Sequence, residues 1–195
     1  MSRTRRPGPA LPYGALDRDH LVKHLLALAR RVGVEHVTMR GLASEASTSA
    51  SSVYYHVSDK AALLDLLAES VLAGIDVPQT GDWTQRITGL YTNAWHAMAE
   101  IPGIAALLQQ RPLAGAADTM DRAAKSILAE SGLAPEDLET AHAVLYLHLL
   151  GSVQLEHHLR DSGIVVAPPR DGEVLYQRGL RVILAGLTHD QRSHR

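Results

Sequence analysis

The stretch that decides the fold is residues 38–64, which read TMRGLASEASTSASSVYYHVSDKAALL. Thr38 can cap a helix that keeps Leu42, Ala43 and Ala46 on one face. A short polar break, Ser47-Thr48-Ser49, follows, and a second helical piece ends at His56-Val57. Two short helices separated by a tight turn predict a helix-turn-helix at about residues 38–56.

Longer apolar helices flank this motif on both sides. Upstream, Asp17 can cap a helix over about 18–32, which Gly33 ends, with apolar residues Leu21, Leu25, Leu28 and Val32 at helical spacing. Downstream, Ser58-Asp59 can cap a helix whose buried stripe is Leu63, Leu64, Leu67 and Val71. We expect Val53, Leu42, Ala46 and Val57 to join these residues in the core of the small domain.

The rest of the chain is predicted to be helical as well. A linker at 76–82 precedes helices over about 83–100, 104–110, 115–131, 136–160 and 172–187, with a loop at 163–172 and a frayed polar tail at 188–195. No stretch alternates β-branched residues over the length of a strand. The sequence therefore predicts an all-α fold: a basic arm (1–16), a three-helix domain with the helix-turn-helix (17–76), and a second helical domain (77–195).

Composition and charge narrow the classes of function. Residues 1–60 contain nine Lys and Arg against five Asp and Glu, a net of +4, while residues 61–195 contain ten against sixteen, a net of −6. A basic first third suits a chain that meets phosphate at one end. The chain has no Cys, which excludes disulfides and thiolate chemistry. It also has no apolar run long enough to span a bilayer and no signal-peptide pattern, so we expect a cytoplasmic protein with no membrane partner.

Residues 17–76 resemble the N-terminal domain of the TetR family of transcriptional repressors. The likeness lies in Thr38-Met39-Arg40-x-Leu42-Ala43, and in the ending Val53-Tyr54-x-His56-Val57-x-x-Lys60-x-x-Leu63-Leu64. The ending Tyr-x-His-Val-x-x-Lys is typical of the branch that contains the tetracycline repressor. One departure is the turn, where the family often has Gly followed by Val and this chain has Ala46-Ser47-Thr48.

The resemblance and the residue types both point to double-stranded operator DNA as a partner. A recognition helix needs small residues where it enters the major groove, and hydroxyl, ring and cationic groups can contact phosphates and bases. The residues predicted to bind DNA are Thr38, Arg40, Ser49, Ala50, Ser51, Ser52, Tyr54, Tyr55, His56 and Lys60. Taken singly, the serine-rich segment could be only a loop, and Tyr54 could be a core ring whose hydroxyl is satisfied there. Arg3, Arg5 and Arg6 either lie in a minor groove or form a solvated tail.

The second domain resembles the same branch more weakly, through Trp83, Arg111-Pro112, Gly132-Leu133, Gly151-x-Val153 and the final helix. In that branch the last two long helices of each subunit pack into a four-helix dimer interface, and an effector cavity lies above the DNA-binding heads. The resemblance therefore implies a homodimer. We expect its interface along Leu145, Leu149 and Val153, and along Leu180, Ile183, Leu184 and Leu187, although these stripes could instead fill the subunit's own core.

The predicted effector is a small, largely apolar molecule. The positions that bind magnesium and its water in the tetracycline repressor fall on Leu107 and near Leu155, and leucine cannot ligate Mg²⁺. We therefore expect no metal and no cofactor. The candidate effector-binding residues are Tyr91, Trp95, Leu107, Gln110, Met120, His142 and Tyr146, each of which could instead be an ordinary core residue. His157 and His158 point about 100° apart on a helix, so they cannot both bind one metal ion together with Glu156. We expect them at the surface or at the dimer seam instead.

The leading hypothesis is a homodimeric repressor that binds a palindromic operator and is released by an effector. An activator of the same fold would have the same sequence features. A small helical enzyme is the alternative from another class, but no nucleophile–base pair, phosphate loop or paired carboxylates support it. A helical adaptor that binds protein through the same surface is the third hypothesis.

Overall fold

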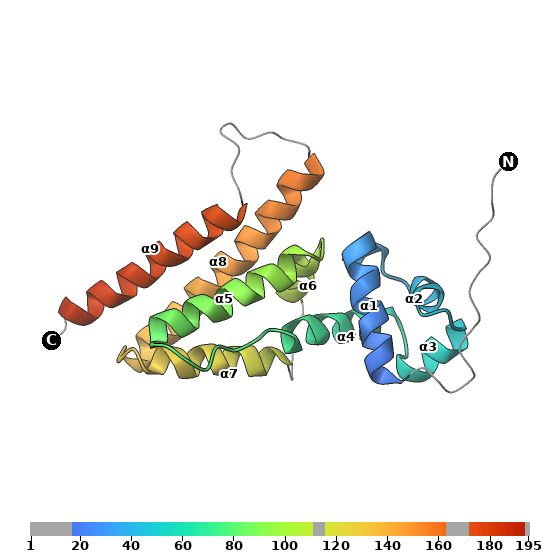
Figure 1. Cartoon of the computed structure of the whole chain (residues 1–195), viewed down its shortest axis with the longest axis horizontal. Helices are drawn as coiled ribbons and strands as arrows, with labels where there is room; N and C mark the ends of the chain where they lie inside the picture. Colours follow the sequence, from blue (N-terminus) through green and yellow to red (C-terminus); the bar gives the residue numbers. More distant parts are fainter. Residues whose placement is uncertain (1–16, 111–115, 163–171, 194–195) are drawn as a thin grey trace.

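The computed structural model describes residues 17–110, 116–162 and 172–193, and its regular elements there are all helices (Figure 1). The arm at 1–16 lies outside the described residues. The molecule is elongated, with α1 to α3 at one end and α8 and α9 toward the other. The all-α prediction is confirmed.

The N-terminal end, called the head here, contains α1 (Arg18–Val32), α2 (Met39–Glu45) and α3 (Ala50–His56), with a short 3-10 turn at Val34–His36. Each helix starts where a side-chain oxygen accepts a hydrogen bond from the first turn. Asp17 accepts from the His20 N–H at 2.8 Å and Thr38 accepts from the Gly41 N–H at 3.0 Å. Both caps were predicted, because Asp and Thr can satisfy N–H groups that the first turn leaves unpaired.

The turn between α2 and α3 is tight and strained at one residue. Ser47 has φ +50°, in the left-handed region that L-residues other than Gly, Asn and Asp rarely adopt. A backbone hydrogen bond from Thr48 N to Ala43 O, 2.9 Å long, closes the turn, and Ala46 is buried beneath it. The chain thus keeps the backbone of a glycine turn while having serine there.

Replacing Ser47 by Gly should stabilise the protein. Glycine adopts positive φ without the steric cost of a Cβ, so S47G should raise the free energy of unfolding by about 0.5–1 kcal/mol in urea titrations. Ser44, exposed on α2, is the matched control: S44G should lower it by about 0.5 kcal/mol, because glycine weakens a helix interior. A loss of stability in S47G would show that the turn is not strained.

The larger end, called the body here, contains α5 (Trp83–Ala99), α6 (Ile104–Gln110), α7 (Ala116–Ala129), α8 (Pro135–Ser162) and α9 (Gly172–Ser193). The helix α4 (Lys60–Ala73) joins the head to the body and packs against both, contacting α1 on one side and α5, α6 and α7 on the other. A linker follows α4, and α5 begins at a capping box in which Asp82 and Gln85 bond each other's backbone N–H.

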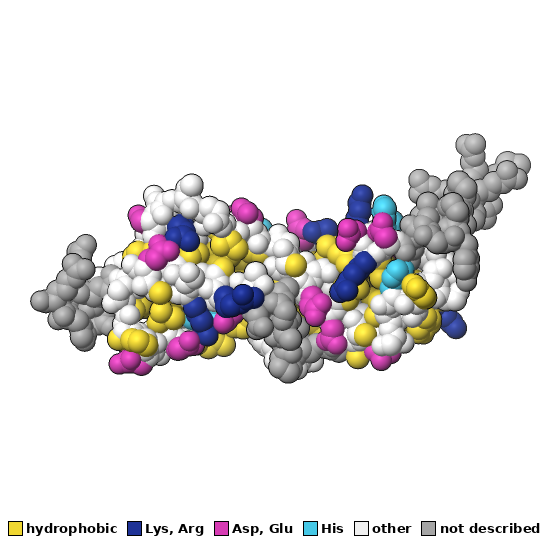
Figure 2. Space-filling model, turned by 90° about the horizontal axis from the view of Figure 1, so that it is seen from below, with side chains coloured by type: hydrophobic (Ala, Val, Ile, Leu, Met, Phe, Trp, Pro, Cys, Tyr) yellow, Lys and Arg dark blue, Asp and Glu magenta, His cyan; other side chains and the backbone are white. Residues whose placement is uncertain are grey.

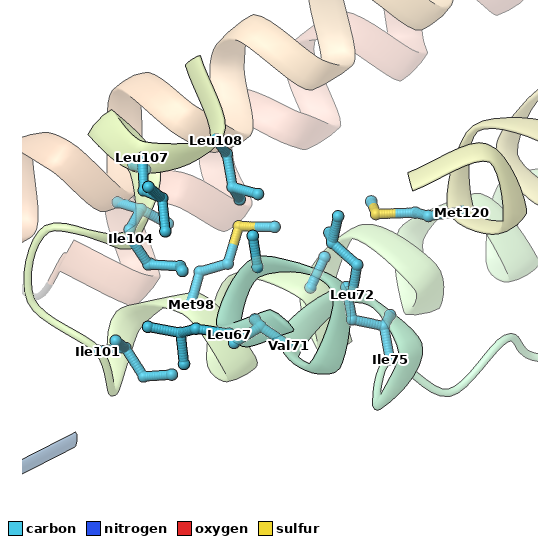
Figure 3. Close-up of a cluster of buried hydrophobic side chains, with 14 of the residues drawn as sticks. Leu67, Val71, Leu72, Ile75, Met98, Ile101, Ile104, Leu107, Leu108 and Met120 are labelled. Carbon is cyan, nitrogen blue, oxygen red and sulfur yellow. The ribbon is translucent and has the colours of Figure 1, made fainter. Parts of the chain in front are cut away.

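A single hydrophobic core therefore runs from the head into the body through α4. Figure 3 shows side chains of α4 facing those of α6 and the end of α5, with Met120 of α7 beside them. Leu63 and Leu67 are fully buried, as are Met98 and Ile104 on the facing elements. The predicted core residues Leu42, Ala46, Val53 and Val57 are all buried, so that prediction is confirmed.

Head and body also meet at a second place. The Val34 N–H, just after α1, donates to the Pro102 carbonyl at 2.9 Å, and Arg30 pairs with Glu100 at 2.7 Å. Gly33 ends α1 with φ +76°, and its Cα lies against Pro102, where an added Cβ would be 3.4 Å from the proline Cβ. The corner between α5 and α6 is thus bonded directly to the head.

Two predictions about the last helices are wrong. Helix α9 continues to Ser193, whereas the sequence predicted an end near 187. Most residues of the stripes expected at a dimer interface instead fill the subunit's own core, which was the alternative: Leu145, Leu149 and Val153 are fully buried, as are Leu180 and, nearly so, Leu184. Ile183 and Leu187 are only half-buried, so the prediction for these two is not tested by the subunit alone. No helix in the described ranges combines the length and the apolar character needed to cross a membrane.

Candidate nucleic-acid interface and internal polar site

The residues predicted to bind DNA lie on the surface of the head. Ala50 and Ser52 are half-buried, and the other eight are exposed. They come from the start of α2, the whole of α3 and the first turn of α4, so one end of the molecule holds the entire set (Figure 1). The structure thus places these residues on adjoining elements of the head.

Helix α3 divides its side chains between core and solvent. Val53 is fully buried and anchors the helix, while Tyr54 is 54% exposed and Tyr55 is 87% exposed. The Tyr55 ring meets the His56 ring edge to face at 5.3 Å. Single exposed apolar side chains are ordinary, but neighbouring aromatic rings that are both exposed form the kind of patch that marks an interaction site. The hypothesis that Tyr54 is a core ring is wrong.

The serines at the start of α3 are already bonded to one another. Ser49 Oγ accepts from the Ser52 N–H at 3.2 Å and lies 2.8 Å from Ser51 Oγ and 2.9 Å from Ser52 Oγ. These contacts cap the helix and hold the hydroxyls together. The small size of the residues keeps the start of α3 slender, which lets a helix approach base edges in a groove.

The cations of this surface are not gathered in one dense patch. Lys60 Nζ donates to the Glu35 carbonyl at 3.3 Å, and Arg40 is exposed on α2. On the face shown in Figure 2, Lys and Arg side chains alternate with Asp and Glu at both ends of the molecule. Any DNA affinity must therefore depend on positioned contacts as well as on net charge.

The candidate effector residues lie in the body on α5 to α8. Tyr91 and Trp95 are buried on α5, Leu107 and Met120 are buried on α6 and α7, and Gln110 is exposed at the end of α6. On α8, His142 and Tyr146 are half-buried, with ring centroids 6.4 Å apart. Burial lowers the pKa of His142, so its imidazole stays neutral near pH 7 although Asp121 lies 3.4 Å away.

Two polar atoms in this region are buried without a partner. Among the described residues, the Tyr91 hydroxyl and the Trp95 indole N–H have no hydrogen-bond partner. Burial raises the pKa of Tyr91, and the nearby Asp121 and Tyr146 raise it further, so the phenol stays protonated and can donate. Buried polar groups are nearly always bonded in native proteins, so two orphans one helical turn apart single out this part of α5.

Sequence reasoning missed the residues that hold this site from the side of α9. Tyr176 is buried there; its hydroxyl donates to the Tyr91 carbonyl at 2.8 Å, and its ring stacks between Trp95 and His148 at 5.7 and 5.1 Å. The only sequence signal for this role of Tyr176 was the presence of a tyrosine within the apolar pattern of the last helix. Asp121, placed beside His142 by α7, was also missed.

The prediction for His157 is wrong. It is buried rather than at the surface, and its Nε2 donates to the Ala99 carbonyl at 3.0 Å, a carbonyl that also accepts from Arg160. His157 thus satisfies an orphan acceptor at the end of α5. His158 is exposed, as expected. No three His, Asp or Glu side chains gather to form a metal site in the described ranges.

Loss of the hydroxyl should change the free energy of unfolding differently at the two buried tyrosines. Y176F removes a bonded hydroxyl and should lower the free energy of unfolding by about 1 kcal/mol, whereas Y91F removes an unbonded one and should leave it unchanged or raise it. Urea denaturation of the ligand-free protein measures both. A clear loss in Y91F would mean that its hydroxyl has a structural partner.

These features define a helix-turn-helix domain, set on a helical body. The model of bacterial regulatory proteins of the tetR family matches residues 21–67. A transcriptional regulator of the helix-turn-helix type from Saccharopolyspora erythraea is 32% identical, over 88% of this chain and 84% of its own length. The class A tetracycline repressor from transposon 1721 in Escherichia coli is 31% identical, over 75% of this chain and 69% of its own.

The chain belongs to the TetR family and is a helix-turn-helix DNA-binding transcriptional regulator. Its fold matches a solved structure, ActR of Streptomyces coelicolor in complex with (S)-DNPA, with a TM-score of 0.72, 21% identity and coverage of 91% of this chain and 99% of the other. Regulators of this family are not enzymes, which excludes the enzyme hypothesis.

Proposed function

We propose that this protein is a cytoplasmic, homodimeric repressor that binds a palindromic operator and is released by a small molecule bound in its body. The observation that supports this most is the exposure of Tyr54 and Tyr55 on α3, a helix whose one fully buried residue is Val53. A surface of this kind is complementary to a groove of DNA, where the rings meet sugars and thymine methyls while the hydroxyls meet phosphates.

The residues predicted to bind DNA have distinct roles in this proposal. Thr38 keeps its hydroxyl hydrogen free for phosphate because its oxygen accepts from Gly41. Lys60 exchanges a neutral backbone carbonyl, that of Glu35, for a charged phosphate, which is the stronger acceptor. Tyr54, Tyr55 and His56 face the bases and the backbone beside them. Two heads of a dimer would meet half-sites about one helical turn apart.

Removing the Lys60 charge tests the DNA surface. K60A should weaken binding to a palindrome from the promoter beside the gene, and should reduce the slope of log affinity against log salt by about 1, because one phosphate contact is lost. Lys23, exposed on α1 outside the predicted surface, is the matched control: K23A should leave the slope unchanged. Fluorescence anisotropy of the labelled palindrome measures both.

Weak binding by the unaltered protein that is insensitive to salt and indifferent to sequence would contradict the operator proposal. An in vitro transcription assay on the same promoter then separates repression, in which added protein lowers transcript yield, from activation.

The dimer proposal rests on apolar side chains that the subunit leaves exposed on α8 and α9. On α8 these are Val144, Leu147 and Leu155, and on α9 they are Val174, Leu175 and Val182. Val182 is 72% exposed and Leu147 is 66% exposed. Gly151 and Gly186 lie on the same helices with open space where a Cβ would be, so a partner helix can approach closely there. This outer face replaces the stripes expected from the sequence.

Charge introduced into this face should separate the subunits. L147E and V182E place a carboxylate where the proposed interface is apolar, and burying an unpaired charge is unfavourable, so sedimentation should show monomers at concentrations where the unaltered protein is a dimer. Q109E, on the exposed end of α6, adds the same charge elsewhere and should stay dimeric. Dimers in all three variants would exclude this interface.

The effector proposal rests on the orphan donors of α5. An apolar ligand between α5, α7 and α8 would lie against Met120 and Tyr146, and acceptor atoms on it would satisfy the Tyr91 hydroxyl and the Trp95 N–H. We therefore expect an effector that is largely apolar and also carries oxygen or nitrogen acceptor atoms. Leu107 is a buried core residue of α6 and Leu155 faces outward, so a tetracycline–magnesium site at those positions is not proposed.

A ligand in the body would act on the head through the two junctions described above. Helix α6 packs against α4, and the corner before α6 is bonded to Val34. A shift of α6 would therefore displace the head at both places where it is attached to the body. Differential affinity of the ligand for two head positions would supply the coupling free energy that lowers operator affinity.

A further inference from the structure

A groove lies on the head beside the candidate DNA surface. Its volume is about 640 Å³, and it is lined by the start of α1, the end of α3 and the outer side of α4. Arg18 and Leu21 come from α1, and Tyr54, Tyr55 and His56 from α3. The residues contributed by the turn and by α4 are Val57, Ser58, Ala62, Asp65, Leu66 and Glu69. The groove belongs to neither the body nor its polar site.

The α4 wall of this groove is acidic. Asp65 and Glu69 are one helical turn apart, so their carboxylates share a face, and both are half-buried. Glu69 makes no ion pair or hydrogen bond with any residue that the structure describes. Without a paired cation, the half-buried Glu69 carboxylate would repel the DNA phosphates that lie close to it in the proposed complex.

The N-terminal segment of the same chain carries positive charge that is complementary to this acidic wall. Sixteen residues precede Asp17, and they contain Arg3, Arg5 and Arg6 with no Asp or Glu. The segment joins the molecule at Asp17, next to Arg18, which itself lines the groove. An extended chain covers roughly 3.3–3.6 Å per residue, so the ten residues between Arg6 and Asp17 reach any part of the groove. A tethered segment also acts at an effective concentration in the millimolar range.

We propose that residues 1–16 dock into this groove, with their arginines beside Asp65 and Glu69 and their apolar residues against its aromatic wall. Arginine pairs with carboxylate through two parallel hydrogen bonds, and partial burial strengthens the pairing. In the DNA-free protein, Leu11 and Tyr13 provide apolar surface for the rings of Tyr54 and Tyr55, and operator DNA displaces them from these rings. The docked segment pairs with the Glu69 carboxylate beside Asp65 and adds positive charge to the flank of α3.

The absence of native cysteine makes a direct test possible. S2C in the full-length, DNA-free protein accepts a single nitroxide label, and its relaxation effect on isotope-labelled protein reports which amides it approaches. At low ionic strength the amides of Ala62, Asp65, Leu66 and Glu69 should lose most of their intensity relative to the reduced label. D65N/E69Q should restore them, whereas E35Q, which removes an exposed carboxylate of the head outside the groove, should not.

Three results would overturn the proposal. One is the absence of broadening in the groove of the unaltered protein, and another is broadening that D65N/E69Q leaves unchanged. The third comes from mixing nitroxide-labelled chains without isotope with isotope-labelled chains without nitroxide: broadening there as strong as in the doubly labelled chain would show that the occupant is another copy's arm. Because no DNA is present, these outcomes do not depend on operator binding.

Discussion

The burial of α4 on two sides is the constraint on which the rest of the structure depends. An isolated helix of this length is marginal in water, and a three-helix head of this size has little core of its own. Leu63 and Leu67 are buried against the head and the body in one continuous cluster. The head therefore owes its stability to the body, and any repacking around α4 alters both.

The head and the body each contain side chains whose polarity does not suit their surroundings. The head exposes the rings of Tyr54 and Tyr55, and among the described residues the body buries two hydrogen-bond donors, on Tyr91 and Trp95, that have no partner. Both are departures from ordinary packing, and departures of this kind are found most often at functional sites. The strained Ser47 is a third departure, at the turn that orients α3.

Local features were predictable from sequence, and packing partners were not. Asp17 and Thr38 were identified as caps because capping depends on residues three positions apart, and Gly33 ended α1 for an equally local reason. The role of Tyr176 depends on a contact with Tyr91 across 85 positions, which no periodicity reveals. The apolar stripes of α8 and α9 were recognised, but periodicity alone cannot say whether a stripe faces its own core or a second subunit.

The bond between Val34 and Pro102 limits how the head can move. A rigid unit attached through one helix could tilt in any direction, but this head is held at α4 and again at the corner before α6. These two attachments define a line through the junction of head and body. If the head moves relative to the body, rotation about this line would carry α3 along one arc and change the direction in which its exposed rings face.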